Sequence, residues 1–313
     1  MTILAISGLI RPLLEPRLPA DLEVRWFMTR EEAIAAAAEA EIGWFDMNDK
    51  EAMAATVRAA GRLKWLNSIY AGLDFLPLDV LAERGVTVTN GAGINAIAIA
   101  EYVLMGMLTI AKDYRAVMRA ADRREWLYDS PGKRELAGTK ALLLGYGAIG
   151  QQVKPRLEGC GIEVSVVRRS AGGKGVLGPE EWRSRLGEFD WIILAVPATP
   201  ETDRMIGAAE LAAMKRDAVL VNVARGEVVD QPALVEALQA RAIGGAFLDV
   251  TTPEPLPDDH PLWSLDNAHI SMHLSGRSQD KMFIRSAERF LENLARYRAG
   301  EPVAPVFDPV RGY

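Results

Sequence analysis

The sequence predicts an α/β protein built of doubly wound parallel sheets, and three observations favour this fold class. Short apolar runs alternate with helical segments along most of the 313 residues, as strands and crossover helices do. Near the middle of the chain, a glycine-rich turn joins one such run to a helix. The chain is also long enough for two hydrophobic cores. We therefore expect two domains of this class with an interdomain cleft.

The first third of the chain contains candidate strands that alternate with helices. The strands are expected at residues 2–7, 23–27, 41–45, 65–69 and 86–88. The helices are expected between them, at 30–40, 51–60 and 75–84. This alternation predicts a first parallel sheet.

The middle of the chain contains enough strands for a complete doubly wound domain. These six strands are expected at residues 141–145, 163–167, 191–196, 218–223, 243–250 and 268–272. Residues 94–121 contain no proline and one internal glycine, which predicts one long helix leading into this second domain. A last helix, at about 278–298, is long enough to return to the first domain.

Composition excludes several classes of partner. A net charge of −6 and a pI near 5.3 argue against nucleic-acid binding through a general basic surface. The single cysteine, Cys160, rules out an internal disulfide and fits a reducing compartment, and with only three histidines no metal site is expected. No apolar run approaches 18 residues, and the N-terminus reads as a strand rather than a signal peptide. We expect a soluble, cytoplasmic protein without nucleic-acid or membrane partners.

The turn ALLLGYGAIG, residues 141–150, places three glycines between a strand and a helix. Gly145 permits a tight turn, Gly147 lets the backbone approach a pyrophosphate, and Gly150 lets the helix lie close to the strand. The N-terminus of that helix offers N–H groups and the positive end of its dipole to phosphates. The pattern predicts dinucleotide binding, with a purely structural turn as the alternative. Pro155 is expected to kink the helix or to mark a short first segment.

Three later predicted strands are each followed by one polar group, namely Arg225, Glu254 and His273. Ligands of a parallel sheet lie beyond the carboxyl ends of its strands. An arginine can bind a carboxylate in two-pronged fashion, and a histidine can donate the proton that accompanies hydride transfer. A carboxylate beside the histidine keeps the imidazole charged and oriented. The three together predict reduction of a 2-oxo acid.

Each of these residues also has an ordinary explanation when it is taken alone. Arg225 can be a surface arginine, and Glu254 can be one more charge in a proline-rich loop. Their joint position behind a dinucleotide turn favours function. The remaining histidines, His260 and His269, are expected to be structural.

Four segments, in chain order, resemble the D-isomer-specific 2-hydroxyacid dehydrogenase family: GYGAIG, VNVARGEVVD, FLDVTTPEPLPDDHPLW and HLSG. SIYAGLD, residues 68–74, resembles the family's substrate-carboxylate loop, and VTNGAGINAIAIAEYVL resembles its hinge and interdomain helix. The similarity covers nearly the whole chain. It implies two Rossmann-like domains: a flavodoxin-like substrate domain at 1–93 plus 282–313, and a dinucleotide-binding domain at 94–281.

The resemblance also implies roles for individual residues. Arg225 would bind substrate, Glu254 would tune the histidine, and His273 would be the acid/base. The backbone of Ala71 and Gly72 would contact the substrate carboxylate. The implied cofactor contacts are Gly145, Gly147, Ala148, Ile149, Gly150, Arg168, Arg169, Ser170, Val196, Pro197, Thr202, Val223, Ala224, Asp249 (to the nicotinamide carboxamide), His273 and Ser275.

Two positions depart from the family's pattern. Met272 stands where proline is common before the histidine, so the turn there is expected to be looser. Arg168 stands where an acidic residue often ends the second strand of the nucleotide domain. With Arg169 and Ser170 it is expected to contact the 2′-phosphate of NADPH, the alternative being a solvated loop.

The sequence therefore predicts NADPH-dependent reduction, with NADH weaker, of a small 2-oxo acid to the D-2-hydroxy acid. The pattern is most similar to that of NADPH-dependent glyoxylate/hydroxypyruvate reductases, and a homodimer is a family-level expectation. A larger or aromatic 2-oxo acid remains an alternative, as does a dinucleotide-sensing interaction protein on the same fold. Such a sensor would not need all three polar residues.

Two hydrophobic segments have open assignments. Trp44, Phe45 and Met47 can either line the space for the substrate side chain or pack in the core. The stretch 126–128 can pack on a partner subunit.

Overall fold

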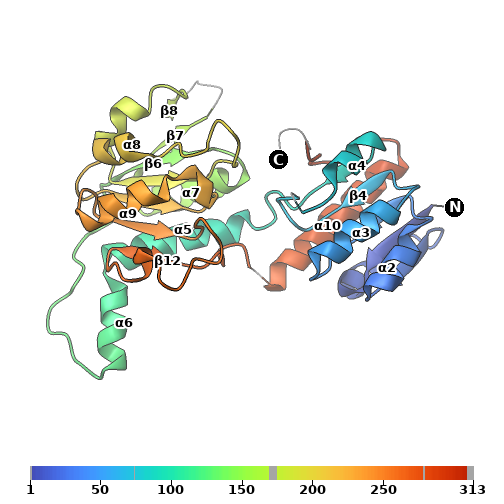
Figure 1. The fold of residues 1–313 in the computed structure, drawn as a ribbon, viewed down its shortest axis with the longest axis horizontal. Coiled ribbons are helices and arrows are strands. Elements are labelled where there is room, and N and C mark those ends of the chain that lie inside the picture. The colour runs from blue at the N-terminus through green and yellow to red at the C-terminus, as the bar shows by residue number, and fades with distance from the viewer. Residues whose placement is uncertain (1, 74, 169–174, 278, 309–313) are drawn as a thin grey trace. The chain divides into compact units, whose positions relative to one another are not determined.

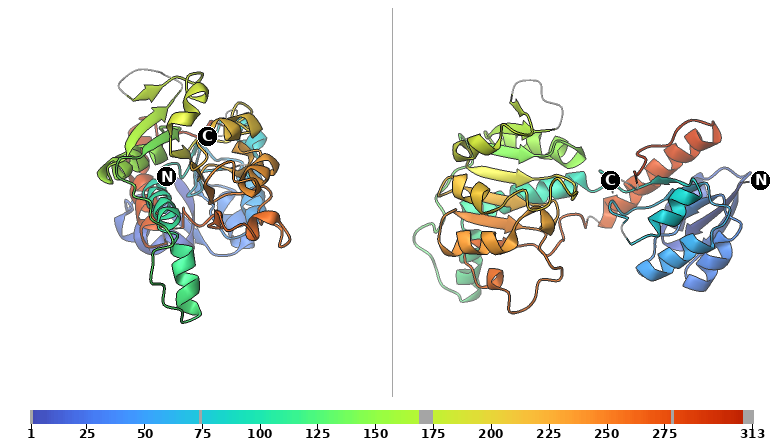
Figure 2. Two further views of the ribbon diagram at one scale, coloured as in Figure 1. Left: turned by 90° about the vertical axis from the view of Figure 1, so that its left-hand side faces the viewer. Right: turned by 45° about the horizontal axis from the view of Figure 1, so that its top comes forward.

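In the computed structural model the described residues are 2–73, 75–168, 175–277 and 279–308. The chain divides into two compact units, one of Met1–Asn95 with Ser278–Tyr313 and one of Ala96–Arg277. Figures 1 and 2 show that each unit consists of a sheet covered by helices. The predicted α/β class with parallel sheets is confirmed.

The first unit contains a five-stranded parallel sheet in the order β2-β1-β3-β4-β5. This order is that of flavodoxin-like doubly wound folds. Its strands are β1 (Ile3–Ser7), β2 (Glu23–Phe27), β3 (Ile42–Trp44), β4 (Trp65–Asn67) and β5 (Thr87–Thr89). Its helices are α1 (Arg11–Leu14), α2 (Arg30–Ala37), α3 (Lys50–Ala59), α4 (Leu78–Glu83) and α10 (Gln279–Arg298), with short 3-10 turns at Gly8–Ile10 and Glu15–Arg17.

Alternate residues of these strands enter separate cores on the two faces of the sheet. Ala5 packs with α2 and α3 on one face, whereas Leu4 and Ile6 pack with α1 and α10 on the other. Trp44 and Phe45 are each only 2% exposed, and the Trp44 ring lies 5.1 Å from that of Phe290. These two aromatic residues are therefore core residues and do not line a substrate pocket.

The second unit contains a seven-stranded sheet in the order β12-β11-β10-β9-β6-β7-β8, parallel throughout. Its strands are β6 (Lys140–Leu144), β7 (Glu163–Val167), β8 (Val176–Leu177), β9 (Trp191–Leu194), β10 (Val219–Asn222), β11 (Gly245–Leu248) and β12 (Ala268–Ile270). Its helices are α5 (Ala96–Ala111), α6 (Tyr114–Asp122), α7 (Ala148–Gly159), α8 (Ala208–Ala213) and α9 (Gln231–Gln239), with 3-10 turns at Arg183–Glu188, Gly226–Val228 and Pro261–Trp263. Strand order reverses at β6, which is where such sheets bind dinucleotides.

The strands of this unit are buried on both faces, as parallel strands usually are. Leu142 and Leu144 of β6 pack in the core that includes α8 and α9. Ala141 and Leu143 pack in the opposite core, with α5 and α7. Each fully buried leucine contributes roughly 1.5–3 kcal/mol to stability, so both cores hold the carboxyl ends of the strands in place.

Several sequence expectations about elements of this unit differ from the structure. The single helix expected over 94–121 is wrong, because it breaks into α5 and α6 at Asp113, whose φ is +42°. The returning loop packs on this break so closely that a Cβ on Gly132 would lie 2.1 Å from the Lys112 carbonyl carbon. Pro155 does not mark the end of a short first segment, because α7 continues through it; the expected kink stays a prediction. Strand β12 ends at Ile270, two residues earlier than expected, because a turn follows.

No helix in the described part of the chain is both long enough and apolar enough to cross a bilayer.

Candidate active site

The glycine turn after β6 is shaped by the space around its backbone. Gly145 has φ +99°, and a Cβ there would lie 2.3 Å from the Ala195 carbonyl oxygen. A Cβ on Gly150 would lie 2.4 Å from the Gly145 carbonyl oxygen, so helix α7 crosses close to the strand. At Gly147, by contrast, a Cβ would meet no atom within 4 Å. Packing does not require that glycine, whereas a ligand lying against the backbone would.

The first turn of α7 offers backbone donors beside this open space. Gln151 N–H donates to the Gly147 carbonyl at 3.0 Å, so it is the first amide to join the helix ladder. Among the described residues, the N–H groups of Ala148, Ile149 and Gly150 have no protein acceptor. Free N–H groups at the positive end of a helix dipole bind phosphate. The turn therefore fits the pyrophosphate of a dinucleotide.

Two other loops at this edge of the sheet contain residues expected to contact the cofactor. Arg168 follows β7 and is exposed, with its N–H directed to the Leu177 carbonyl at 3.4 Å. Arg169 and Ser170 lie outside the described residues. After β9, Thr202 Oγ1 donates to the Pro197 carbonyl at 2.7 Å. Thr202 thus closes the loop that begins with Val196.

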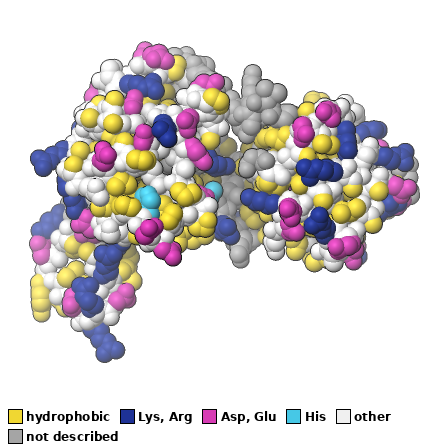
Figure 3. Space-filling view, in the orientation of Figure 1, with side chains coloured by type: hydrophobic (Ala, Val, Ile, Leu, Met, Phe, Trp, Pro, Cys, Tyr) yellow, Lys and Arg dark blue, Asp and Glu magenta, His cyan; other side chains and the backbone are white. Residues whose placement is uncertain are grey.

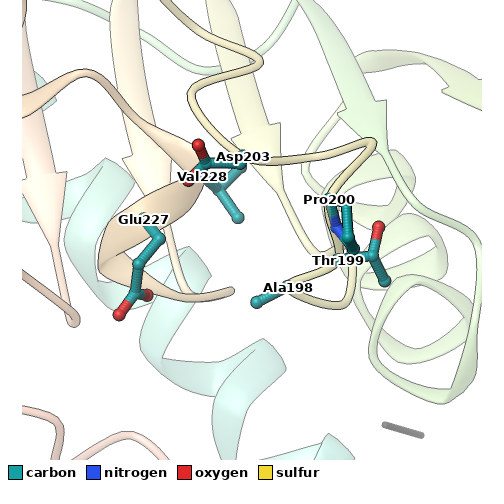
Figure 4. Close-up of a pocket in the computed structure, with 6 residues that line it drawn as sticks. All are labelled: Ala198, Thr199, Pro200, Asp203, Glu227 and Val228. Carbon is teal, nitrogen blue, oxygen red and sulfur yellow. The ribbon is translucent and has the colours of Figure 1, made fainter. Parts of the chain in front are cut away.

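A pocket of about 300 Å³ lies between this loop and the segment after β10. Ala198, Thr199 and Pro200 contribute from the first loop, Glu227 and Val228 from the second, and Asp203 completes the lining (Figure 4). The pocket adjoins Arg225 along the chain, so it belongs to the same edge of the sheet.

Arg225 extends from the end of β10 and is exposed. Asn222 holds its backbone, since Asn222 Nδ2 donates to the Arg225 carbonyl at 2.9 Å and Asn222 Oδ1 accepts from Ala224 N–H at 3.0 Å. Val223 and Ala224, both expected to contact the cofactor, are only 5% exposed.

Glu254 and His273 form a hydrogen-bonded pair after the next two strands. Glu254 Oε2 lies 2.7 Å from His273 Nδ1, while Glu254 Oε1 accepts from Thr251 N–H at 3.1 Å. A carboxylate only accepts, so Nδ1 carries the hydrogen and Nε2 is left to face a ligand. Because β10, β11 and β12 are neighbours in the sheet, Arg225, Glu254 and His273 share one edge.

His273 lies in a backbone turn that is unusual for its residues. Met272 and His273 both have φ +54°, and Leu274 N–H donates to the Ser271 carbonyl at 3.2 Å. Positive φ at both central positions is the type I′ geometry, which favours asparagine and glycine. Strain of this kind persists only where surrounding contacts impose it.

The Asp249 carboxylate supplies those contacts. It is 2% exposed, and its Oδ1 accepts from Ser271 Oγ at 2.7 Å, from Leu274 N–H at 3.1 Å and from Ser275 N–H at 3.2 Å. Ser275 Oγ donates to Oδ2, and His273 N–H donates to the Asp249 carbonyl at 2.6 Å. The turn at Met272 is therefore held firmly rather than loosely. Asp249, expected at the nicotinamide, and Ser275, expected at the cofactor, form its support.

The other two histidines lie in different surroundings. His260 Nδ1 accepts from Leu262 N–H at 3.3 Å at the start of a 3-10 turn. His269 is partly buried in β12, where desolvation and then the charge of Arg115 lower its pKa. His260 thus caps a turn and His269 is a partly buried strand residue, so each has a structural part in the fold.

The expected substrate-carboxylate loop follows β4 in the first unit. Ala71 is exposed and Gly72 is partly exposed. Among the described residues, neither N–H group donates to a protein acceptor. The Ala71 carbonyl accepts a hydrogen bond from Asn90 Nδ2 at 2.6 Å. Two adjacent free amides suit a carboxylate.

The strand order, the glycine turn and the free helix N-terminus together define the class of dinucleotide-binding α/β oxidoreductases. The chain belongs, within that class, to the D-isomer specific 2-hydroxyacid dehydrogenase family. Residues 104–275 match the family model described as "D-isomer specific 2-hydroxyacid dehydrogenase, NAD binding domain". That part of the chain is thus an NAD-binding domain.

Individual relatives agree with this assignment. A glyoxylate reductase from Korarchaeum cryptofilum is 35% identical over 260 residues, 78% of this chain and 75% of that one. A glycerate dehydrogenase from Methylorubrum extorquens is 29% identical over 95% of both chains. The crystal structure of a D-isomer specific 2-hydroxyacid dehydrogenase from Xanthobacter autotrophicus, in complex with NADPH and MES, superposes with a TM-score of 0.78 at 28% identity, covering 100% of this chain and 99% of that one.

Sequence reasoning missed the residues that hold these loops. Asn222 and Asn90 are 1% and 3% exposed, and each fixes the backbone beside a proposed ligand contact. An asparagine after a strand is common in turns, so its position alone gave no signal. The hydrogen bonds of Asn222 and Asn90 to the loops beside them identify their role in holding the backbone.

Proposed function

We propose that this chain reduces a small 2-oxo acid, of the glyoxylate and hydroxypyruvate type, to the D-2-hydroxy acid with NADPH. The observation that carries the proposal is the Glu254–His273 pair at 2.7 Å, on the same sheet edge as Arg225 and the glycine turn. The names of the two relatives support a small substrate. We also propose that the protein works in the cytoplasm, a reducing compartment that suits its free Cys160.

The residues divide the chemistry between them. The bound nicotinamide would supply a hydride to the keto carbon. His273 Nε2 donates a proton to the carbonyl oxygen, and Glu254 stabilises the imidazolium before that transfer. Arg225 binds the substrate carboxylate and polarises the carbonyl. The Ala71 and Gly72 amides are donors for the same carboxylate.

A turnover assay tests the proposal directly. Oxidation of NADPH would be followed with glyoxylate, hydroxypyruvate, pyruvate and phenylpyruvate as substrates. We expect the highest kcat/KM for one of the first two. If phenylpyruvate is preferred, the substrate class is wrong, and if none of the four is turned over, the proposed function fails.

The preference for NADPH is expected to depend on Arg168. A hydrogen bond to a charged group contributes roughly 1.5–3 kcal/mol, so one bond to the 2′-phosphate favours NADPH by about ten- to a hundredfold. In Arg168→Ala the ratio of kcat/KM for NADPH over NADH should collapse, and in the wild type it should fall as salt rises. Arg216→Ala is the control, because this exposed arginine precedes β10 at the opposite edge of the sheet. Equal use of both cofactors by the wild type would contradict the assignment.

We further propose that the protein forms a homodimer through α6 and the loop after it. Exposed aromatic side chains lie there, with Tyr114 53%, Trp126 81% and Tyr128 95% exposed. Figure 1 shows α6 leading away from the rest of its unit, and Figure 3 shows hydrophobic and charged side chains side by side at the same place.

The dimer proposal makes a prediction about mass in solution. Buried aromatic residues at an interface contribute about 2 kcal/mol or more, or ~30-fold in Kd. Light scattering should give a dimer for the wild type and mostly monomer, at micromolar concentration, for the double variant Trp126→Ser and Tyr128→Ser. Val306→Ser removes a 55% exposed side chain elsewhere and should leave the dimer intact. A monomeric wild type would refute the proposal.

A further inference from the structure

Asp46 lies just beyond β3 and binds the segment that follows β4. Its Oδ2 accepts from Trp44 Nε1 at 2.6 Å and from Ile69 N–H at 2.5 Å. Its Oδ1 accepts from Ser68 Oγ at 2.7 Å. One partly buried carboxylate therefore joins the ends of two neighbouring strands at the first residues of the loop that leads to Ala71.

The rest of this loop is fixed from its other side. Gly91 N–H donates to the Tyr70 carbonyl at 2.8 Å. Gly91 also lies so close that a Cβ there would be 1.8 Å from the Ile69 carbonyl oxygen. With the Asn90 bond to the Ala71 carbonyl, these contacts fix the backbone of residues 68–71. The N–H groups of Ala71 and Gly72 have no acceptor among the described residues.

We propose that Asp46 is a positioning residue for substrate binding, because its carboxylate sets the place of the Ala71 and Gly72 amides that receive the substrate carboxylate. The inference rests on the proposed function for the role of those amides. It does not require Asp46 to touch substrate, since Asp46 acts through Ser68 and Ile69.

Stability alone does not explain a charge at this position. Desolvation raises the pKa of Asp46 to about 6, against the lowering effect of bonds from Ile69, Ser68 and Trp44. A raised pKa in the folded state favours folding most below the ordinary value near 3.8, and this contribution is lost as pH rises through about 6. At neutral pH the ionised carboxylate therefore favours folding less than its protonated form would.

No charged side chain among the described residues contributes to the shift of the Asp46 pKa. Trp44, Ser68 and Ile69 present uncharged donors to Asp46, and the nearest charges along its own segment, Asp49 and Lys50, are exposed. Protonation of Asp46 replaces an acceptor by an O–H group and loosens the three bonds. Binding of a 2-oxo acid should then weaken below pH 6.

The kinetic test compares Asp46→Ala, Asp46→Asn and the control Asp49→Asn. An asparagine keeps one acceptor oxygen for Trp44 and Ile69, and Asp49 caps α3 through a bond from Ala52 N–H that asparagine can also accept. We expect KM for glyoxylate to rise about tenfold or more in the alanine variant and less in Asp46→Asn. The wild-type KM should rise below pH 6 but stay flat in Asp46→Asn, with kcat and NADPH affinity near wild type in both. Unchanged KM in both variants, or an equal loss of NADPH affinity, overturns the proposal.

A second measurement separates this inference from the proposed function. Amide signals of Ile69, Ala71 and Gly72 in NMR spectra of the whole chain should titrate with a midpoint near pH 6 in wild type and not in Asp46→Asn. Titration without turnover of any 2-oxo acid would uphold the link between Asp46 and the loop while the proposed function fails. Amides that do not respond to pH near 6 would refute the link, whatever the enzyme reduces.

Discussion

His273→Ala is expected to lower kcat by about 10²–10⁴-fold, the usual contribution of a positioned general acid. The alanine removes the Nε2 proton donor and leaves Glu254 without its partner at 2.7 Å. The glycine turn and α7 are untouched, so NADPH affinity, measured by fluorescence, should stay within about twofold, well under 1.4 kcal/mol. Stopped-flow turnover with the best 2-oxo acid gives the rate.

His269→Gln is the matched control for this experiment. His269 precedes the turn in β12 and is partly buried beside Arg115, so its replacement should leave kcat near the wild-type value. A His273→Ala variant with normal turnover, together with loss of activity in His269→Gln or in a His260 variant, would move the proton donor to one of those residues.

Arg225→Lys should lower kcat/KM for every 2-oxo acid by roughly 10–100-fold, since one charge-assisted bond contributes about 1.5–3 kcal/mol. Lysine keeps the charge but lacks the planar fork that binds a carboxylate with two parallel bonds. Asn222 holds the backbone at this residue, so the side chain alone is changed. Steady-state kinetics with several 2-oxo acids measures the effect.

Arg204→Lys serves as the control. The Arg204 side chain is 70% exposed, and its ion pair with Asp230 is long, at 4.0 Å. It should keep wild-type efficiency. A fully active Arg225→Lys variant would show that the positive charge suffices and that the two-pronged contact is not made.

The fold could be predicted because most of its strands are buried on both faces and read as short apolar runs between helical segments. The break between α5 and α6 could not, since Asp113 alone gives no helix-stop signal. It depends on a loop some twenty residues later, where Gly132 meets the Lys112 backbone. Contacts of this kind between distant residues have no trace in local periodicity.

The site was predictable to the extent that parallel strands deliver their following residues to one edge. That rule placed Arg225, Glu254 and His273 together. It could not distinguish a residue that contacts a ligand from one that holds a loop. Asp249 and Asp46 show this, because both carboxylates accept from backbone N–H groups of a neighbouring loop. Both are acidic residues after a strand, and only their hydrogen-bond partners separate the two roles.

The turn at Met272 limits which residues this chain can exchange with its relatives. Proline at this position would fix φ near −65°, whereas Met272 has φ +54°. A chain that acquired proline here would also have to rebuild the backbone of His273 and the five hydrogen bonds that residues 271–275 make to Asp249. A change from methionine to proline at this site would therefore require accompanying changes in the turn. Sequences that share Met272 should share the supporting serines as well.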